Sequence, residues 1–411
     1  MRHKTLPCHG GRPSRRARVH TGLPSVPHRQ QGEASVSRKS AAGERGLPAS
    51  GDGEMLRVSL HRFAEANGRQ DAAALRSSGA DRTAIERPPL VLPLPPLAAR
   101  PFWSVMIPIY NAREDYLRET LQSVLCQDPG VEAMQIEVLD NCSTIGDPEA
   151  LVREIGGGRV AFHRQTHNLG IAGNFNACIE RARGRWVHIL HGDDTVRPEF
   201  YRRARSGIET HREVAAALCR IIYMDEDGQW TGLADLESRQ RGVLDGGFAW
   251  RQFLDQRIQF VGMVVARSTY EELGGFRPSL PSCLDWDMWK RIALGKPVHY
   301  EPEPLACYRL HEGAESSRLI ATAENVREER RSIVYSCASL PASQAMLARR
   351  AAAKAAGVRA ARRARRLWKT GLRGAAWRQC AAAVRCSLAP AVLARTAFFV
   401  LCAIMDRSHI A

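Results

Sequence analysis

The chain of 411 residues carries 59 Lys or Arg against 43 Asp or Glu, a formal net charge of +16, and the excess lies at its two ends. Residues 345–411 hold fourteen basic residues and a single acid, whereas 55–344 are slightly acidic, which excludes a basic core that binds nucleic acid. The 11 cysteines are scattered without a CxxC pair, which excludes a disulfide framework or zinc site and favours a reducing cytoplasmic location.

Residues 1–100 are predicted to be a disordered, basic and Pro-rich N-terminal segment. Residues 1–54 are polar, rich in Gly, Pro, Ser and Arg, and lack the apolar run that a secretory signal requires. The run PPLVLPLPPL at 88–97 favours a polyproline-II linker into the first strand. Two alternatives stay open for the start of translation, Met1 and Met55.

The next part of the chain alternates between strand and helix patterns. Apolar runs typical of buried strands lie at 104–110, 136–140, 160–164 and 185–190, and helical spacing occupies 115–127, a stretch from 148, and 172–183. Three strand-helix units followed by a fourth strand predict a parallel, doubly wound α/β sheet. Ligands bind such sheets beyond the carboxyl ends of the strands.

Polar residues follow every one of these strands. They are Tyr110 and Asn111, then Asp140, Asn141 and Ser143, then His167 and Asn168, then Asp193 and Asp194. Each one alone is explained as well by a helix cap or turn. Together they predict a binding edge, and this edge lacks the glycine-rich turn of a dinucleotide or P-loop site.

The stretch HGDD places Asp193 and Asp194 side by side at the end of the fourth strand. Two carboxylates at the end of an apolar strand repel each other unless a cation neutralises them. Oxygen ligands of this kind suit Mg²⁺ or Mn²⁺ bound to a diphosphate. The alternative is that one of them caps the helix that starts near Pro198.

The second half of the chain contains a further predicted strand and a candidate functional acid before the basic tail. The run FVGMVVAR at 260–267 indicates another buried strand. In LDWDMW, Asp285 opens a helix whose Trp286 and Trp289 share a face. Asp285 is explained either as a functional carboxylate at a helix N-terminus or as an N-cap.

Residues 345–411 are predicted to form an Ala/Arg-rich basic helical tail. The apolar stretch 388–405 is interrupted by Pro390 and Arg395, which argues against a membrane-spanning helix. Two interpretations stay open for this tail. It lies on an anionic membrane surface, or it packs on the α/β domain or a partner as a helical hairpin.

Seven motifs occur in an order and spacing that resemble family 2 glycosyltransferases, the inverting enzymes of the GT-A fold. They are SVMIPIYNA, LQSVLCQ, VLDNCST, NLGIAGNFN, HILHGDD, LDWDMW and YRLHEGAESS, over about residues 102–318. The resemblance implies a GT-A catalytic domain at 101–340, a doubly wound mixed sheet with a Rossmann-like nucleotide-binding half. It also implies a nucleotide-diphosphate-sugar donor, a divalent metal, Mn²⁺ or Mg²⁺, and a single displacement at the anomeric carbon.

By this resemblance, Pro108 and Tyr110 pack on the donor base, and Asp140 accepts the imide N–H of a uracil. Asn111, Asn141, Ser143 and Asn168 join them as nucleotide-sugar contacts. Asp194 is the metal ligand, and Asp193 faces the ribose or the donor sugar. The family's aspartate motif usually begins with Asp, whereas Gly192 stands at that place here, which puts the ribose contact in doubt.

The resemblance also implies roles in the second half. Asp285 is the catalytic base, although Leu284 replaces the Glu that usually precedes it, and Asp287 is the second choice. Trp286 stacks on a sugar or belongs to the core. His311 contacts the metal or the diphosphate, and Arg309 screens the charge of the leaving group.

The predicted function is therefore a metal-dependent, inverting hexosyltransferase. It uses a nucleotide-sugar, first of all a UDP-sugar, and a glycan or lipid-linked acceptor in cell-surface polysaccharide or lipopolysaccharide synthesis. The expected location is cytoplasmic, with peripheral association at the inner face of the membrane as an extension, and no nucleic-acid partner is expected. The alternatives are a nucleotidyltransferase and a nucleic-acid-binding protein that uses its basic tails.

Overall fold

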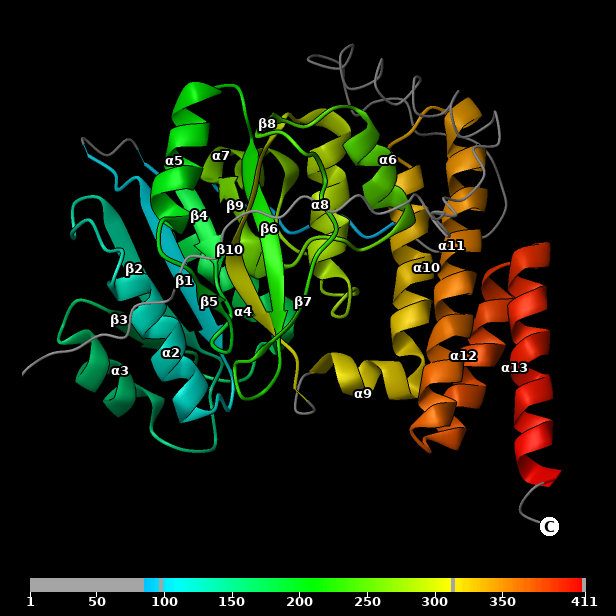
Figure 1. The fold of residues 1–411 in the computed structure, drawn as a ribbon. Helices are drawn as coiled ribbons and strands as arrows, with labels where there is room; N and C mark the ends of the chain where they lie inside the picture. Colours follow the sequence, from blue (N-terminus) through cyan, green and yellow to red (C-terminus); the bar gives the residue numbers. More distant parts are fainter. Residues whose placement is uncertain (1–84, 96–98, 312–314, 409–411) are drawn as a thin grey trace, which may run out of the picture. The chain divides into compact units, whose positions relative to one another are not determined.

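The computed structural model describes residues 85–95, 99–311 and 315–408, all within one compact unit of the chain, 49–411 (Figure 1). The predicted disorder of residues 1–84 and the choice between Met1 and Met55 lie outside the described residues.

The first half of the central sheet has the predicted parallel topology. Strands β1 (Trp103–Ile109), β2 (Met134–Asp140), β3 (Ala161–Arg164) and β4 (Trp186–Ile189) lie in the order β3-β2-β1-β4. β1 pairs in parallel with both β2 and β4, and β2 with β3. Their carboxyl ends therefore meet at one edge of the sheet.

The second half of the sheet is mixed. β9 (Met263–Ala266) runs antiparallel to both β4 and β6 (Ala216–Met224), and β10 (Val298–Arg309) returns parallel to β6. The short strands are β5 (Thr195–Val196) and β8 (Gly242–Val243), both antiparallel to β10, and β7 (Trp230–Leu233), antiparallel to β6. Pairing with β5 brings the end of β10 beside the turn that follows β4.

Helices cover both faces of the sheet because its strands are apolar on both sides. One core cluster joins alternate residues of β1 to α2 (Glu114–Leu125), α3 (Pro148–Gly156) and α5 (Phe200–Thr210). The other joins Met106, on the opposite face of β1, to α4 (Gly170–Arg181), α7 (Arg267–Leu273) and α8 (Leu284–Gly295). The predicted fold class, a doubly wound α/β sheet of mixed direction, is confirmed.

Residues 85–95 contact the catalytic domain, although the sequence placed them in the disordered segment. Val91 is buried, Gly275 N donates to the Pro89 carbonyl at 2.7 Å, and Arg277 Nε donates to the Glu86 carbonyl at 2.9 Å. The structure thus packs residues of the predicted polyproline-II linker on the domain, and the polyproline-II conformation of 88–97 stays a prediction. Prolines lack an N–H but keep their carbonyl acceptors, and the domain uses one of these.

The C-terminal part is helical, as predicted. The helices of this part are α9 (Glu315–Thr322), α10 (Glu324–Cys337), α11 (Ala342–Lys369), α12 (Arg373–Cys386) and α13 (Pro390–Ser408). An earlier helix, α6 (Gly247–Leu254), precedes β9. Ala348, Ala352 and Ala356 of α11 form a stripe that packs on Phe253 of α6 and Ile333 of α10. Packing on the catalytic domain, one of the two interpretations of the tail, therefore describes α11. None of the described helices is both long and apolar enough to cross a membrane.

Candidate active site

The turn after β4 gathers three potential metal ligands. The ligand atoms of His191, Asp193 and Asp194 lie within 4.8 Å of one another. His311, just beyond β10, adds a fourth, because its Nε2 lies 2.9 Å from Asp193 Oδ2. The structure thus brings the predicted ligands Asp194 and His311 to one place. It adds His191, which the sequence analysis missed although it follows the fourth strand directly.

Two buried atoms of this turn have unused bonding capacity. Asp194 Oδ1 accepts a hydrogen bond from the Arg309 backbone N–H at 2.9 Å. Among the described residues, neither Asp194 Oδ2 nor His191 Nε2 has a hydrogen-bond partner. Buried polar atoms are normally paired, so these two atoms are candidate ligands for an ion.

The surroundings shift the pKa values of the two aspartates in opposite directions. Burial and the neighbouring Asp193 raise the pKa of Asp194 well above its usual range. Burial opposes ionisation of Asp193 as well, but the hydrogen bond from His311 and the nearby His191 lower the pKa of Asp193 overall. A divalent cation would relieve the repulsion between them, and this set of oxygen and imidazole ligands fits Mn²⁺ or Mg²⁺.

Gly192 departs from the usual aspartate motif for a steric reason. A Cβ at this position would lie 2.7 Å from the Cγ2 of Ile109, a buried residue at the end of β1. A side chain here would therefore require the core at the end of β1 to shift.

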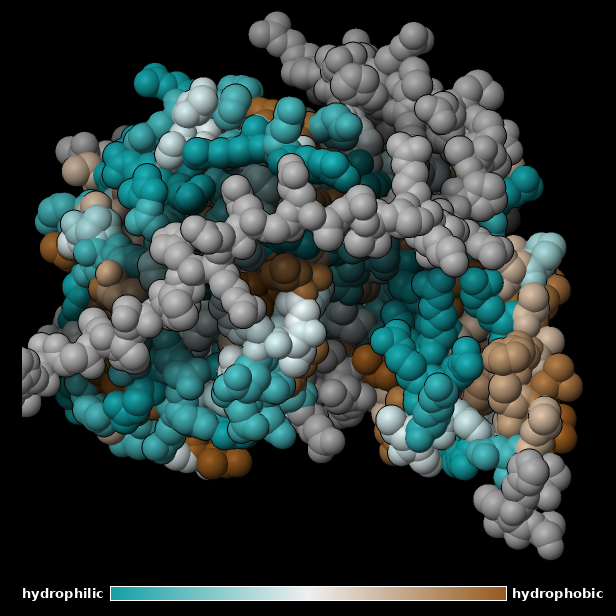
Figure 2. Space-filling view, viewed as in Figure 1, coloured by the Kyte–Doolittle hydropathy of each residue, from teal (hydrophilic) through white to brown (hydrophobic). Residues whose placement is uncertain are grey.

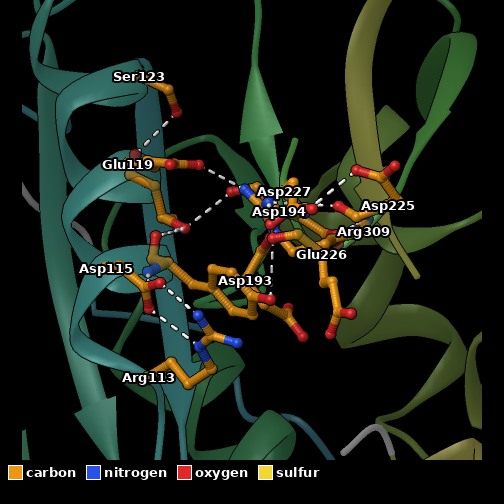
Figure 3. Close-up of polar contacts among 12 residues, drawn as sticks. Arg113, Asp115, Glu119, Ser123, Asp193, Asp194, Asp225, Glu226, Asp227 and Arg309 are labelled. Atoms are coloured by element: carbon orange, nitrogen blue, oxygen red, sulfur yellow. Dashed lines mark hydrogen bonds and ion pairs between the residues drawn. The ribbon is translucent and has the colours of Figure 1, made fainter. Parts of the chain in front are cut away.

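Arg309 is surrounded by protein partners beside the turn after β4 (Figure 3). Its buried guanidinium donates to the Asp193 carbonyl at 2.9 Å and to Glu119 Oε2 at 2.5 Å. It also reaches the carbonyls of Asp225 and Glu226 in the turn after β6 and stacks on Tyr116. These partners occupy the guanidinium, and the predicted role in screening the charge of a leaving group stays a prediction.

Arg309→Met is expected to lower the free energy of unfolding by about 3 kcal/mol, because it leaves Glu119 and several carbonyls without their buried partner. Urea unfolding measures this change. The exposed Arg113–Asp115 pair provides the control, since Arg113→Met should cost less than about 1 kcal/mol. Equal losses of unfolding free energy in the two variants would contradict the conclusion that the buried contacts of Arg309 stabilise the fold.

The other end of the site lies at the tips of β1, β2 and β3. Tyr110 is 49% exposed at the end of β1 and presents its ring to solvent. Asn111 N donates to Ser143 Oγ at 2.8 Å, and Asn111 Oδ1 accepts from Thr144 N at 2.8 Å, so the loops after β1 and β2 are tied together. Contact of Tyr110, Asn111 and Ser143 with a nucleotide stays a prediction.

Asp140 is fully buried beneath this edge. It accepts hydrogen bonds from Ser143 Oγ at 2.5 Å and from Arg164 Nε at 2.6 Å. The Arg164 side chain is 42% exposed, whereas that of Asp140 is 0% exposed. Arg164, which the sequence analysis missed, is therefore the residue at the surface, and contact of the buried Asp140 with a uracil stays a prediction.

Three further predicted contacts are changed by burial or by local bonding. Pro108 is buried within β1, so it offers no ring surface to a base. Asn141 is also buried, and its side chain bonds to Asn168 Oδ1 at 3.0 Å and to Leu169 N at 2.8 Å. Asn168 in turn accepts from Gly170 N at 2.8 Å. Asn141 and Asn168 shape the turn before α4, the turn role that the sequence left open.

Asp285 begins the first turn of α8 and is held in one orientation. Gln256 Nε2 lies 3.0 and 2.9 Å from its two carboxylate oxygens, and the Trp286 backbone N–H donates to Oδ1 at 2.6 Å. Burial raises the pKa of Asp285 to about 6, although these hydrogen bonds act in the opposite direction. A carboxylate with a pKa near the working pH suits proton transfer.

The structure excludes the second choice of base. Asp287 is fully buried and bonds to Arg277 at 2.6 Å and to Arg291 at 3.0 Å. Trp286 is buried as well, donates its indole N–H to the Gln252 carbonyl, and lies beneath Lys290. The predicted stacking of Trp286 on a sugar is therefore wrong, and its alternative, a core position, holds.

Tyr308 on β10 responds to acids of both candidate groups. Burial and the carboxylates of Asp194, Asp193 and Asp285 together raise the pKa of the Tyr308 hydroxyl. The hydroxyl is therefore subject to the charge of the candidate base and of the candidate metal ligands.

An α/β sheet with acids beyond its parallel strands and a separate carboxylate on a later helix is the arrangement of a glycosyltransferase. Residues 104–262 match Glycosyl transferase family 2, and this part of the chain belongs to that family.

Relatives cover different shares of the chain. An uncharacterized protein of Mycobacterium tuberculosis is 27% identical over 246 residues, 58% of this chain and 76% of its own length. The succinoglycan biosynthesis protein ExoO of Rhizobium meliloti is 40% identical over 98 residues, 24% of this chain and 27% of its own length. Among solved structures, the mannosyltransferase PcManGT from Pyrobaculum calidifontis, in complex with GDP-Man and Mn²⁺, is 17% identical with a TM-score of 0.47, over 85% of this chain and 88% of that one.

Proposed function

We propose that this glycosyltransferase moves a sugar from a nucleoside-diphosphate-sugar to a hydroxyl group of a glycan or lipid-linked acceptor, with inversion, during synthesis of a cell-surface polysaccharide. The observation that carries the proposal is the cluster of His191, Asp193 and Asp194 after β4, whose ligand atoms lie within 4.8 Å of one another. The similarity to a succinoglycan biosynthesis protein supports a polysaccharide product.

Asp285 is the proposed catalytic base. In an inverting displacement, the acceptor oxygen attacks the anomeric carbon while the bond to the diphosphate oxygen breaks on the opposite side. One carboxylate oxygen of Asp285 takes the hydroxyl proton as the new bond forms. Gln256 keeps this carboxylate in place, which limits the reorganisation that the transition state requires.

The nucleotide end is proposed to lie at Tyr110 and Arg164. Tyr110 offers an exposed ring to a base, and Arg164 offers N–H donors held in position by Asp140. Because Asp140 is buried, the donor base is proposed without a restriction to uracil. A divalent ion, Mn²⁺ or Mg²⁺, held by His191, Asp193, Asp194 and His311, would neutralise the charge of the departing diphosphate.

The test is a donor panel with product analysis. The purified chain is mixed with Mn²⁺ and a UDP-, GDP- or dTDP-sugar, and donor binding is followed by thermal stabilisation. Release of nucleoside diphosphate from one donor supports sugar transfer. Release of pyrophosphate from a nucleoside triphosphate would instead indicate a nucleotidyltransferase and overturn the proposal.

Gln256→Leu is expected to move the acid limb of the pH-rate profile above about pH 6. The two hydrogen bonds from Gln256 favour the ionised form of Asp285, so their loss raises the pKa of that carboxyl further. The rate at pH 5.5 should therefore fall more than the rate at pH 8. Gln240→Leu, at an exposed position, is the control, and an unshifted profile in Gln256→Leu would contradict the positioning role.

A further inference from the structure

The last described helix, α13, has two different faces. Val392, Phe399 and Ala403 are buried against the neighbouring helices. On the opposite side, Leu393, Phe398, Leu401 and Ile404 are 42%, 49%, 59% and 59% exposed. These four residues form the apolar face of α13, and Figure 2 shows hydrophobic side chains along this helix. So large a set of exposed apolar side chains on one helix indicates an interaction surface.

A stripe of positive charge runs beside this face. Arg362, Arg365, Arg366 and Lys369 are all exposed on α11, and their spacing places them on one side of that helix. The Arg365 guanidinium carbon lies 5.0 Å from the centre of the Phe398 ring, so the basic stripe adjoins the apolar face. Asp406 is the only acid after residue 341, and it pairs with Arg373.

We propose that the apolar face of α13 and the basic stripe of α11 form a docking surface for an anionic lipid bilayer. An amphipathic helix binds such a surface in the interface plane, with its apolar side at the acyl boundary and its cations at the headgroups. A second copy of the chain fits less well, because it would bring an identical positive stripe to the same surface. This inference does not depend on the proposed reaction.

The structure also limits which basic residues take part. The alanine stripe of α11 packs on the catalytic domain, and Arg359 and Arg363 on that helix both pair with Glu329. The proposed surface therefore excludes Arg359 and Arg363 and includes only some of the basic residues of the tail.

The test measures co-sedimentation of the full chain with vesicles of phosphatidylcholine alone or mixed with phosphatidylglycerol. Binding to the mixed vesicles and not to the neutral ones is expected, and salt should weaken it. Leu401→Gln combined with Ile404→Gln should weaken binding on the order of tenfold or more, because two apolar side chains no longer enter the bilayer. Arg362→Gln combined with Arg366→Gln should reduce binding to the anionic vesicles by about tenfold.

The control replaces exposed apolar residues elsewhere. Val131 and Leu92 are 65% and 68% exposed, and both lie outside α11 and α13. The double variant Val131→Gln with Leu92→Gln should therefore bind vesicles like the wild type. All three double variants change exposed side chains, and unchanged thermal unfolding shows that they fold. Equal binding by the α13 variant and the wild type would overturn the proposal. So would a dimer in solution that the α13 variant abolishes, since a second copy would then occupy the face.

Discussion

Asp285→Asn is expected to reduce kcat by about 10²- to 10⁴-fold and to leave donor binding unchanged. The amide has nearly the shape of the carboxylate, but it cannot accept the proton of the acceptor hydroxyl. In the wild type, burial places the pKa of Asp285 at about 6. Because only the ionised form is a base, the rate should rise with pH through about 6 and then level off.

Initial rates from pH 4.5 to 8.5 measure this profile in both proteins, and calorimetry measures donor binding. Glu213→Gln is the control, because Glu213 is an exposed acid before β6, at the amino ends of the strands. That variant should keep the wild-type rate within about twofold, as expected for a surface change away from the reacting atoms. A rate in Asp285→Asn close to that of the wild type would remove Asp285 from the mechanism.

The parallel half of the sheet was predictable because its signals are local. Each of its strands is an apolar run followed by a helix with its own spacing, and such units join in one known way. The mixed half was expected only from the family resemblance, and its pairings were not predictable from local signals, because β10 pairs with β6, about eighty residues earlier, and with β5. The contact of residues 85–95 with the domain depends on backbone carbonyls, which leave no mark on the sequence pattern.

The candidate site was predictable where a residue's role follows from its neighbours in sequence. Asp194 and His311 come together because both follow strands that end at the same edge. Burial depends on distant residues, so the sequence could not show that Trp286 lies in the core or that Arg309 is enclosed by Glu119 and Tyr116. Asp285 and Asp287 are equally polar in the sequence, and only the positions of Arg277 and Arg291 distinguish them.

The carboxylates after β4 lead to the second large expected effect. Asp194 is enclosed, its Oδ2 has no hydrogen-bond partner among the described residues, and its charge lies beside that of Asp193. Such a carboxylate contributes little to packing that an amide could not supply, because the Arg309 N–H can also bond to an amide oxygen. An amide at this position would lack only the negative charge, and a divalent ion is the ligand that requires this charge.

Asp194→Asn is therefore expected to weaken Mn²⁺ binding by about 100-fold and to abolish metal-dependent donor binding. Mutation of a residue that only supports a metal ligand already lowers metal affinity by up to about 100-fold, so loss of a direct ligand should cost at least as much. The metal-free protein should unfold at the wild-type temperature or above, because burial and Asp193 disfavour the charge that the substitution removes. Electron paramagnetic resonance of free Mn²⁺ measures the affinity, and scanning calorimetry measures unfolding. Glu226→Gln, an exposed acid beside Arg309, should bind Mn²⁺ like the wild type. Undiminished Mn²⁺ binding by Asp194→Asn would place the ion elsewhere in the chain and remove the reason for the aspartate pair.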